Sequence, residues 1–465
     1  MDAANEALGT LISGRQRKDG KHWKTAYEYM QVYLQRLGLD DRIGELSIIH
    51  VAGTKGKGST CAMVESILRS CGYRTGLFTS PHLWTVRERI QINGRPVTED
   101  VYLRAFWQCY RRLEDQADEM VGKAAYFRFL TLLGLHIFLE ERVDVAILEV
   151  GLGGRLDATN VVRTPAVCGI ASLGFDHMEV LGHTLPEIAA EKAGIFKRGA
   201  SALTVRQRPD AMQTLVAKAA EAGAPLSLAP LLAEYEGGAA KRVAAVAARR
   251  LPEEYLRGLA ACQWPGRAQV VHVHQACGNP SDPDGGACAP PCNGHAAHEP
   301  NLGAAEAGGC GTRRGEVQRV LLFNCMPERD PRRLLQPLTA TLAARGLALP
   351  LALFVPADSS YAKLAPSAGP PDLSWQVALQ QVWEADFAPA ARLQAAGATL
   401  PPLPRRAALA AQDAARGAVA PSLHSAVEWL RGCVRQRPGL RMQVLVTGSL
   451  YLVGDILRHL GRPPF

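Results

Sequence analysis

Short apolar runs alternate with amphipathic segments along the first half of the chain. The runs are rich in β-branched residues and predict strands at 46–51, 74–79, 143–150 and 167–172. Apolar residues at helical spacing lie between or after them, at 60–68, 99–118 and 211–222. The run 143–150 is continuously apolar, as in a parallel strand covered on both faces. This alternation predicts an α/β fold with a parallel-rich sheet.

The same pattern continues on both sides of this region. The apolar stripe of residues 3–39 predicts a pair of helices. In the second half, strand and helix patterns recur at 317–338, 352–355, 423–434 and 442–460. Pro/Ala-rich stretches at 357–374 and 399–421 predict connections. We therefore predict two α/β domains, residues 1–260 and 261–465, with an active site in the cleft between them.

Residues 275–316 interrupt the second domain. They are rich in Gly, Pro and Ala and have almost no large apolar residue, so they cannot bury enough surface to offset chain entropy. We predict a disordered, low-complexity insertion, with a mis-spliced gene model as the alternative origin. Cys288, Cys292, His295 and His298 are of the types that bind zinc, but irregular spacing without apolar flanks argues against a zinc site.

A glycine-rich turn joins the first predicted strand to its helix. In residues 53–59 (GTKGKGS), glycines let backbone N–H groups converge on an anion, and the helix N-terminus adds partial positive charge. Lys57 can neutralise phosphate oxygens, and Ser59 or Thr60 can offer a hydroxyl to a phosphate or its Mg²⁺. The spacing is a compact variant of the Walker pattern. It favours a nucleotide-binding loop over the alternative, a glycine turn that only connects a strand to a helix.

Other polar residues follow later strands. Glu149 lies at the C-terminal end of its strand, where such sheets bind ligands, and can hold Mg²⁺; a surface glutamate is the alternative. Considered only as residue types, His177 is typical of a structural histidine and Lys192 of a solvated helix lysine. Arg267 suits a bidentate contact with phosphate, although an arginine beside a turn usually faces solvent.

Composition narrows the class of protein. With 465 residues, 47% hydrophobic and 21% charged, the chain is typical of a soluble protein, and no apolar run has the length of a membrane span. The net charge of +8 suits anionic small molecules. The basic residues are scattered without interleaved aromatics, which argues against nucleic acid.

The cysteines and the N-terminus bear on the compartment. The eleven cysteines occur as singletons, which favours reduced thiols over a disulfide framework. The first ten residues lack the features of a signal or transit peptide. We expect a cytoplasmic protein, with a mitochondrial form if a transit peptide precedes this sequence.

Residues 53–94 resemble the nucleotide loop and the following folate-site loop of eukaryotic folylpolyglutamate synthase, a member of the Mur ligase superfamily. The likeness runs with breaks from about Ala26 to the C-terminus, through SPHL, GLGGRLDATN, DHMEVLGHTLPEIAAEKAGIFK, QWPGR and LVTGSL, at 80–83, 151–160, 176–197, 263–267 and 445–450. The resemblance implies a P-loop domain of the Mur ligase type, followed by a smaller Rossmann-like C-terminal domain.

The resemblance also assigns roles to residues. ATP is held by Gly53, Thr54, Lys55, Gly56, Lys57, Gly58, Ser59, Thr60 and Arg267. Mg²⁺ is held by Ser80, Glu149 and His177, with room for a monovalent cation such as K⁺. The catalytic set is Lys192 as a carbamylated lysine, His177 and Arg267. Folate is contacted by Ser80, Pro81, His82, Tyr126, Phe127, Arg128 and Phe129.

The activity implied by the resemblance is ATP-dependent addition of L-glutamate to the γ-carboxyl of tetrahydrofolate and its polyglutamates through an acyl phosphate. This activity serves folate retention and one-carbon metabolism, and relatives are mostly monomers. Three alternatives stay open. One is a bifunctional enzyme that also acts on dihydropteroate. Another is an impaired nucleotide- and folate-binding protein, because the family's Asp-Gly-Ala-His strand has no counterpart here. The third is an unrelated P-loop ATPase.

Overall fold

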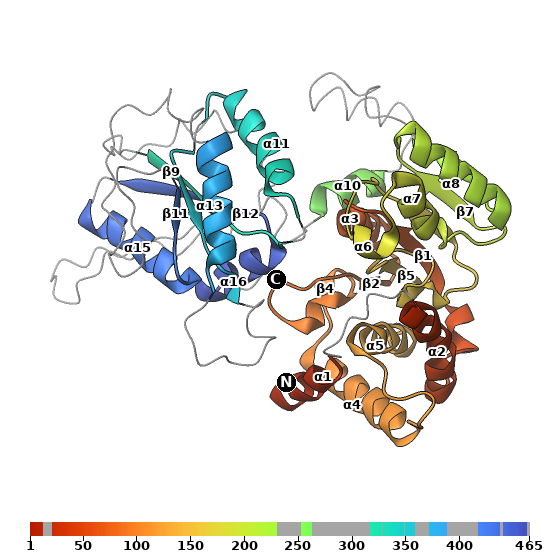
Figure 1. The fold of residues 1–465 in the computed structure, drawn as a ribbon. Coiled ribbons are helices and arrows are strands. Elements are labelled where there is room, and N and C mark those ends of the chain that lie inside the picture. The colour runs from red at the N-terminus through yellow and green to blue at the C-terminus, as the bar shows by residue number, and fades with distance from the viewer. Residues whose placement is uncertain are drawn as a thin grey trace.

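The computed structural model describes residues 1–12, 21–229, 253–262, 317–327, 329–347, 349–358, 372–387, 417–437 and 440–462. These residues build two sheets with helices on their faces, drawn from red to blue along the chain in Figure 1. Arg267, the QWPGR segment, the zinc-type residues and the insertion 275–316 lie outside the described residues. The predicted boundary between residues 260 and 261 falls within the last turn of a helix that ends at Ala261, and it stays a prediction.

The first sheet has eight strands in the order β4-β3-β2-β5-β1-β6-β7-β8. Their bounds are β1 (Ser47–Ala52), β2 (Thr75–Phe78), β3 (Ile90–Ile92), β4 (Arg95–Pro96), β5 (Val145–Glu149), β6 (Val167–Ile170), β7 (Ser201–Thr204) and β8 (Leu226–Leu228). All pairs from β2 to β8 are parallel, while β3 and β4 pair antiparallel at the edge. The predicted parallel-rich sheet is confirmed, and the edge hairpin is an addition to it.

Helices cover both faces of this sheet. They are α1 (Asp2–Thr10), α2 (Lys21–Leu37), α3 (Lys57–Ser70), α4 (Glu99–Asp115), α5 (Tyr126–Glu140), α6 (Met178–Leu181), α7 (Leu185–Ala193), α8 (Pro209–Ala222) and α10 (Glu253–Ala261). Three 3₁₀ turns are η1 (Arg42–Glu45), η2 (Val86–Arg89) and η3 (Ala158–Val161). Successive residues of β5 point to opposite faces of the sheet. Ala146 and Leu148 belong to the hydrophobic cluster that includes α5, whereas Ile147 packs with α3 on the other face.

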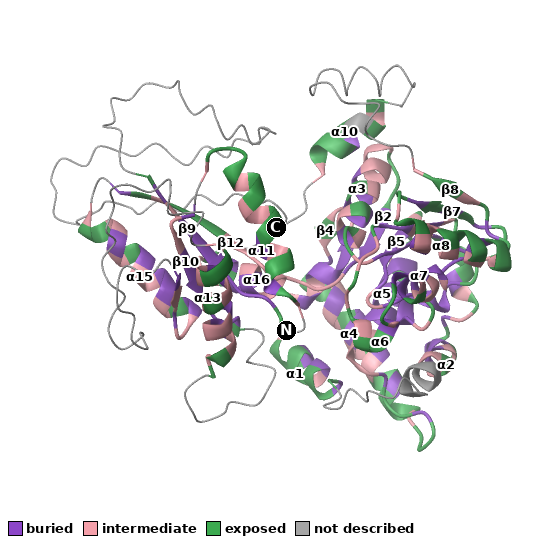
Figure 2. Ribbon diagram, turned by 45° about the horizontal axis from the view of Figure 1, so that its top comes forward, coloured by how far each residue is buried: buried purple, intermediate pink, exposed green. Residues whose placement is uncertain are grey.

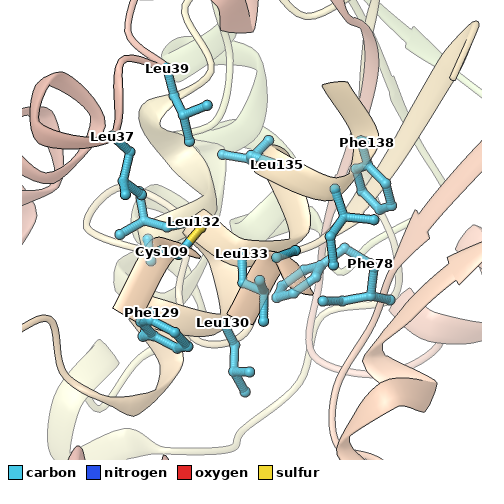
Figure 3. Close-up of a cluster of buried hydrophobic side chains, with 14 of the residues drawn as sticks. Leu37, Leu39, Phe78, Cys109, Phe129, Leu130, Leu132, Leu133, Leu135 and Phe138 are labelled. Carbon is cyan, nitrogen blue, oxygen red and sulfur yellow. The ribbon is translucent and has the colours of Figure 1, made fainter. Parts of the chain in front are cut away.

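The α5 helix forms the centre of the larger core. Its residues from Phe129 to Leu139 are all buried, and Figure 3 shows several of them packed with Phe78 and Cys109. Gly134 lets the helix approach the sheet, since a Cβ there would lie 2.9 Å from the ring of Phe78. In Figure 2, α5 and β5 are largely purple, whereas α8 and α10 show green outer surfaces.

The second sheet has four parallel strands in the order β11-β10-β9-β12. Its elements are β9 (Val317–Phe323), α11 (Pro331–Ala343), β10 (Leu351–Phe354), α13 (Ser374–Asp386), β11 (Gly417–Val419), α15 (Leu423–Gln436), β12 (Arg441–Thr447) and α16 (Leu450–His459). Leu322 faces α15 and α16, while Leu321 faces α11 and α13, so this unit also has three layers. The predicted Rossmann-like unit is confirmed.

One predicted connection is wrong in part. The stretch 399–421 contains the strand β11, which pairs with β10 through Gly417–Val419. Three residues of the sequence Gly-Ala-Val are too few to show a period of two, so the strand had no sequence signal. The seven cysteines among the described residues are free thiols, as expected. No helix in the described part of the chain is both long and apolar enough to cross a membrane.

Candidate functional site

Four loops meet at one edge of the first sheet. Strands β2, β5, β1 and β6 are consecutive and parallel, so their C-terminal ends lie side by side. The loops that follow them begin at residues 79, 150, 53 and 171. The loops carry Gly53 to Gly56, Ser80 and His177, while Lys57 to Ser59 open α3 and Glu149 is the last residue of β5. This edge is where parallel α/β sheets bind ligands.

The nucleotide loop is a tight turn that rests on the neighbouring β6 loop. Gly53 has φ +145°, and a Cβ there would lie 2.8 Å from the Cβ of Ala171. Backbone N–H groups of Thr54 and Lys55 donate to the carbonyl of Ser172, at 2.9 and 3.1 Å. Gly56 is left-handed at φ +84° and caps α3, whose first residue is Lys57. The loop therefore presents a helix N-terminus and a lysine to the site edge.

Three hydroxyl groups lie in the nucleotide loop and the first turn of α3, and they differ in their surroundings. The Thr60 hydroxyl donates to the carbonyl of Gly56 at 2.9 Å, so it is engaged within its own helix. Thr54, the other threonine, exchanges hydrogen bonds through its hydroxyl with the backbone of Gly174. Ser59 is half-buried in the first turn of α3.

Lys192 lies beneath the nucleotide loop. It is 4% exposed on α7, and its Nζ donates to the carbonyl of Gly53 at 2.9 Å. Burial, together with the positive charge of Lys57, lowers the pKa of Lys192 from 10.5 to about 7. The interpretation of Lys192 as a solvated helix lysine is therefore wrong. Near neutral pH a large fraction of this amine is unprotonated and nucleophilic, which is the form that CO₂ converts to a carbamate.

Asp176 joins the nucleotide loop to the second unit. Its carboxylate accepts from the Nζ of Lys55 at 2.8 Å and lies 3.5 Å from Nη2 of Arg329. Burial alone would raise the pKa of Asp176, but the bond to Lys55 and the surrounding positive charge lower it overall. The adjacent His177 is left-handed at φ 53°, and its side chain is 51% exposed. His177 thus lies at the open side of the site.

Glu149 and Ser80 are in direct contact. The backbone N–H of Ser80 donates to Oε2 of Glu149 at 2.9 Å, and Glu149 is only 5% exposed. A carboxylate and an adjacent hydroxyl are oxygen donors of the kind that Mg²⁺ prefers. Among the described residues, no group of three or more His, Cys, Asp or Glu side chains is arranged to hold a metal ion. The predicted set, with Ser80 as its third member, stays a prediction.

The loop after β2 is held by a carboxylate that sequence reasoning missed. Glu88, 5% exposed, accepts from the backbone N–H groups of Leu83, Trp84 and Thr85 at 2.8, 2.9 and 2.7 Å. Its position within the charged run VRER looks solvated in the sequence. The only local signal was Thr85 three residues earlier, which completes a capping box with Glu88.

Two predicted folate contacts are brought together by another missed residue. Arg89 donates from Nε to Nδ1 of His82 at 2.9 Å, and its guanidinium lies 5.6 Å from the ring centre of Tyr126. The peptide bond between Ser80 and Pro81 is cis. The loop after β2 and the start of α5 therefore share one wall of the site.

The predicted contacts at 126–129 do not share one environment. Phe127 packs against the glycine turn after β5, where a Cβ on Gly151 would collide with its ring. Arg128 is half-buried, and burial lowers its pKa. Phe129 is 1% exposed and packs on Phe106 with ring centres 5.2 Å apart. The prediction that Phe129 contacts substrate is therefore corrected, since four consecutive residues encircle a helix and one of them faces the core.

The turn after β5 is fixed by its own polar side chains. Asp157 is buried and accepts from the N–H groups of Leu152 and Thr159, each at 2.9 Å. Asn160 donates to the carbonyls of Arg155 and Gly194. These motif residues hold the turn in shape.

No protein-family model matches the chain. Folylpolyglutamate synthase from Arabidopsis thaliana is 40% identical over 545 residues, which cover 99% of this chain and 87% of that protein. The mitochondrial folylpolyglutamate synthase of Homo sapiens is 50% identical over 226 residues, covering 48% of this chain and 38% of the human protein. The solved Mycobacterium tuberculosis folylpolyglutamate synthase complexed with ADP has a TM-score of 0.66, with 22% identity and 100% of both chains covered. On this near full-length similarity, the chain belongs to the folylpolyglutamate synthase family.

Proposed function

We propose that the protein ligates L-glutamate to the γ-carboxyl of tetrahydrofolate and its polyglutamates, with ATP as the energy source. One observation carries this: the nucleotide loop, the Glu149–Ser80 contact and the His82 loop follow neighbouring parallel strands at one sheet edge. The near full-length relative from Arabidopsis thaliana, named folylpolyglutamate synthase, supports the same activity. This edge can hold a phosphate donor and a carboxylate acceptor within reach of each other.

The nucleotide loop binds the ATP phosphates in this proposal. The free N–H groups at the start of α3 point at the anion, and Lys57 neutralises it. Ser80, Glu149 and His177 would hold Mg²⁺, because a carboxylate, a hydroxyl and an imidazole offer compatible donors. When bound, Mg²⁺ neutralises the charge that develops during phosphoryl transfer.

The reaction has two steps. An oxygen of the folate γ-carboxylate bonds to the terminal phosphorus of ATP, and ADP leaves. The amine of L-glutamate then attacks the acyl carbon, inorganic phosphate leaves, and the amine loses a proton as the amide forms. Lys192, once its neutral amine has been carbamylated by CO₂ with loss of a proton, would supply an anionic oxygen that helps to hold Mg²⁺. Arg267 contributes positive charge opposite the transferred group.

Folate enters along the wall formed by Pro81, His82 and Tyr126, with Phe127 and Arg128 at the start of α5. The half-buried guanidinium of Arg128 suits an anionic substrate group. We infer that the protein acts as a monomer. That the human relative is named mitochondrial supports a mitochondrial form beside a cytoplasmic one.

The test measures ADP release with each substrate omitted in turn. Release should require ATP, tetrahydrofolate and L-glutamate together, and Lys57→Ala should abolish it, while Lys218→Ala, on the outer face of α8, should not. Dihydropteroate in place of tetrahydrofolate distinguishes a bifunctional enzyme, which would also release ADP with it. ADP release that ignores both folate and glutamate would contradict the proposal.

A further inference from the structure

The last helix of the chain, α16, touches the loop after β2. Nη2 of Arg458 donates to the backbone carbonyls of Leu83 and Trp84, at 3.4 and 3.2 Å. These residues follow the Ser80–His82 segment directly. A side chain from the second unit thus binds the loop that the proposed function assigns to metal and folate.

The hydrogen bonds of this loop divide between the two units. Its N–H groups at Leu83, Trp84 and Thr85 are satisfied from within the first unit by Glu88. The carbonyls at Leu83 and Trp84 are satisfied by Arg458 of the second unit. A guanidinium is suited to this bridging role because its N–H groups are rigidly spaced and permanently charged.

Arg458 is itself held in place. Its Nη1 donates to Oδ1 of Asp455 at 3.0 Å, one helical turn earlier, and the Asp455 side chain is 2% exposed. The carboxylate is fixed by its burial, so the guanidinium has a preferred direction before it meets the loop.

A second observation, independent of Arg458, locates the same contact. Gly454 lies one turn before Arg458 on the same face of α16, and a Cβ there would collide with the carbonyl oxygen of Leu83. The backbone of α16 therefore reaches the loop directly, which requires a residue without a side chain at position 454.

We propose that Arg458 is a positioning residue that, with Gly454, fixes the 80–84 loop and so the placement of Ser80 and His82 for folate. The expected kinetic effect rests on the proposed function, whereas the contact between Arg458 and the loop does not. Arg458 touches no reacting atom, and its side chain is 44% exposed.

The kinetic test compares Arg458→Ala with Arg458→Lys and with Arg345→Ala, an exposed arginine of the same unit. Losing two charge-assisted bonds should raise the KM for tetrahydrofolate about tenfold, with the KM for ATP unchanged. Lysine keeps the charge without the fork and should recover part of the loss. Gly454→Ala should give the same selective defect. An unchanged KM for folate in Arg458→Ala, or an equal change in Arg345→Ala, would overturn the inference.

A second readout needs no activity. Amide hydrogen exchange of the peptide that contains Leu83 and Trp84 should be faster in Arg458→Ala than in the wild type, while peptides of the nucleotide loop stay unchanged. If the wild type ligates no glutamate, the proposed function fails, yet faster exchange still upholds the contact. Unchanged exchange in this peptide refutes the positioning role, whatever the activity.

Discussion

Replacing Lys192 with methionine removes a buried, titratable amine while keeping most of its volume. Lys192 is 4% exposed, and within the described residues its amine donates to the carbonyl of Gly53. Burial and the charge of Lys57 lower its pKa from 10.5 to about 7. In the unfolded chain the lysine titrates near its ordinary value, so the two states bind different numbers of protons between these pH values.

The sign and the size of the effect follow from this difference. Between pH 7 and pH 10.5 the unfolded chain holds the proton and the folded protein has lost it, so wild-type stability rises with pH. Below pH 7 the full cost of burying the ammonium remains, about 5 kcal/mol at ~1.36 kcal/mol per pH unit. Methionine removes this cost but leaves the Gly53 carbonyl without its donor, a loss of about 1–3 kcal/mol.

The assay is denaturant unfolding of the wild type and Lys192→Met in bicarbonate-free buffer. The variant should be more stable by about 2–4 kcal/mol near pH 6. This advantage should shrink by about 3 kcal/mol by pH 9. Lys218→Met, at an exposed lysine on α8, should show no such trend. A difference between the wild type and Lys192→Met that stays constant with pH would refute the account of this amine.

Three further substitutions, one of them with a matched control, test other contacts. Glu88→Gln should lower stability by about 1.5–3 kcal/mol in denaturant unfolding, because an amide has one acceptor oxygen for three backbone donors. Gly448→Ala should destabilise the second unit by more than about 2 kcal/mol, since φ is +98° and a Cβ would collide with a backbone carbonyl. Gly346→Ala, at φ +65° with open space, should cost only about 1 kcal/mol; equal losses would contradict the steric argument. Arg329→Ala should lower stability by less than about 1 kcal/mol, because its pair with Asp176 is partly exposed, and high salt should erase the difference.

Local features of the sequence predicted well the elements on which the candidate site is built. The glycine turn at 53–59 needs only nearby residues to form, and the structure places it between β1 and α3 as expected. The position of Glu149 followed from the apolar run before it and from the rule that ligands bind at strand ends.

Features that depend on distant packing were not predictable in this way. The burial of Lys192 arises because α7 returns to the nucleotide loop, 139 residues away in sequence. Glu88 and Arg89 make their hydrogen bonds to Leu83 and His82 only when the loop after β2 has folded back onto them. Phe127 and Phe129 look alike in sequence, and only the rotation of α5 makes Phe129 fully buried and leaves Phe127 partly buried at the edge of the core.

The most direct test of the central claim is mass spectrometry of folate after incubation of the protein with Mg-ATP, tetrahydrofolate and L-glutamate. We expect a series of products, each larger than the last by one glutamyl residue, formed with one ADP per addition. A second incubation with folate ¹⁸O-labelled in the γ-carboxyl should place label in the released phosphate, because that oxygen bonds to phosphorus in the acyl phosphate. Hydrolysis of ATP with no glutamyl product would contradict the assignment of this chain as an active ligase.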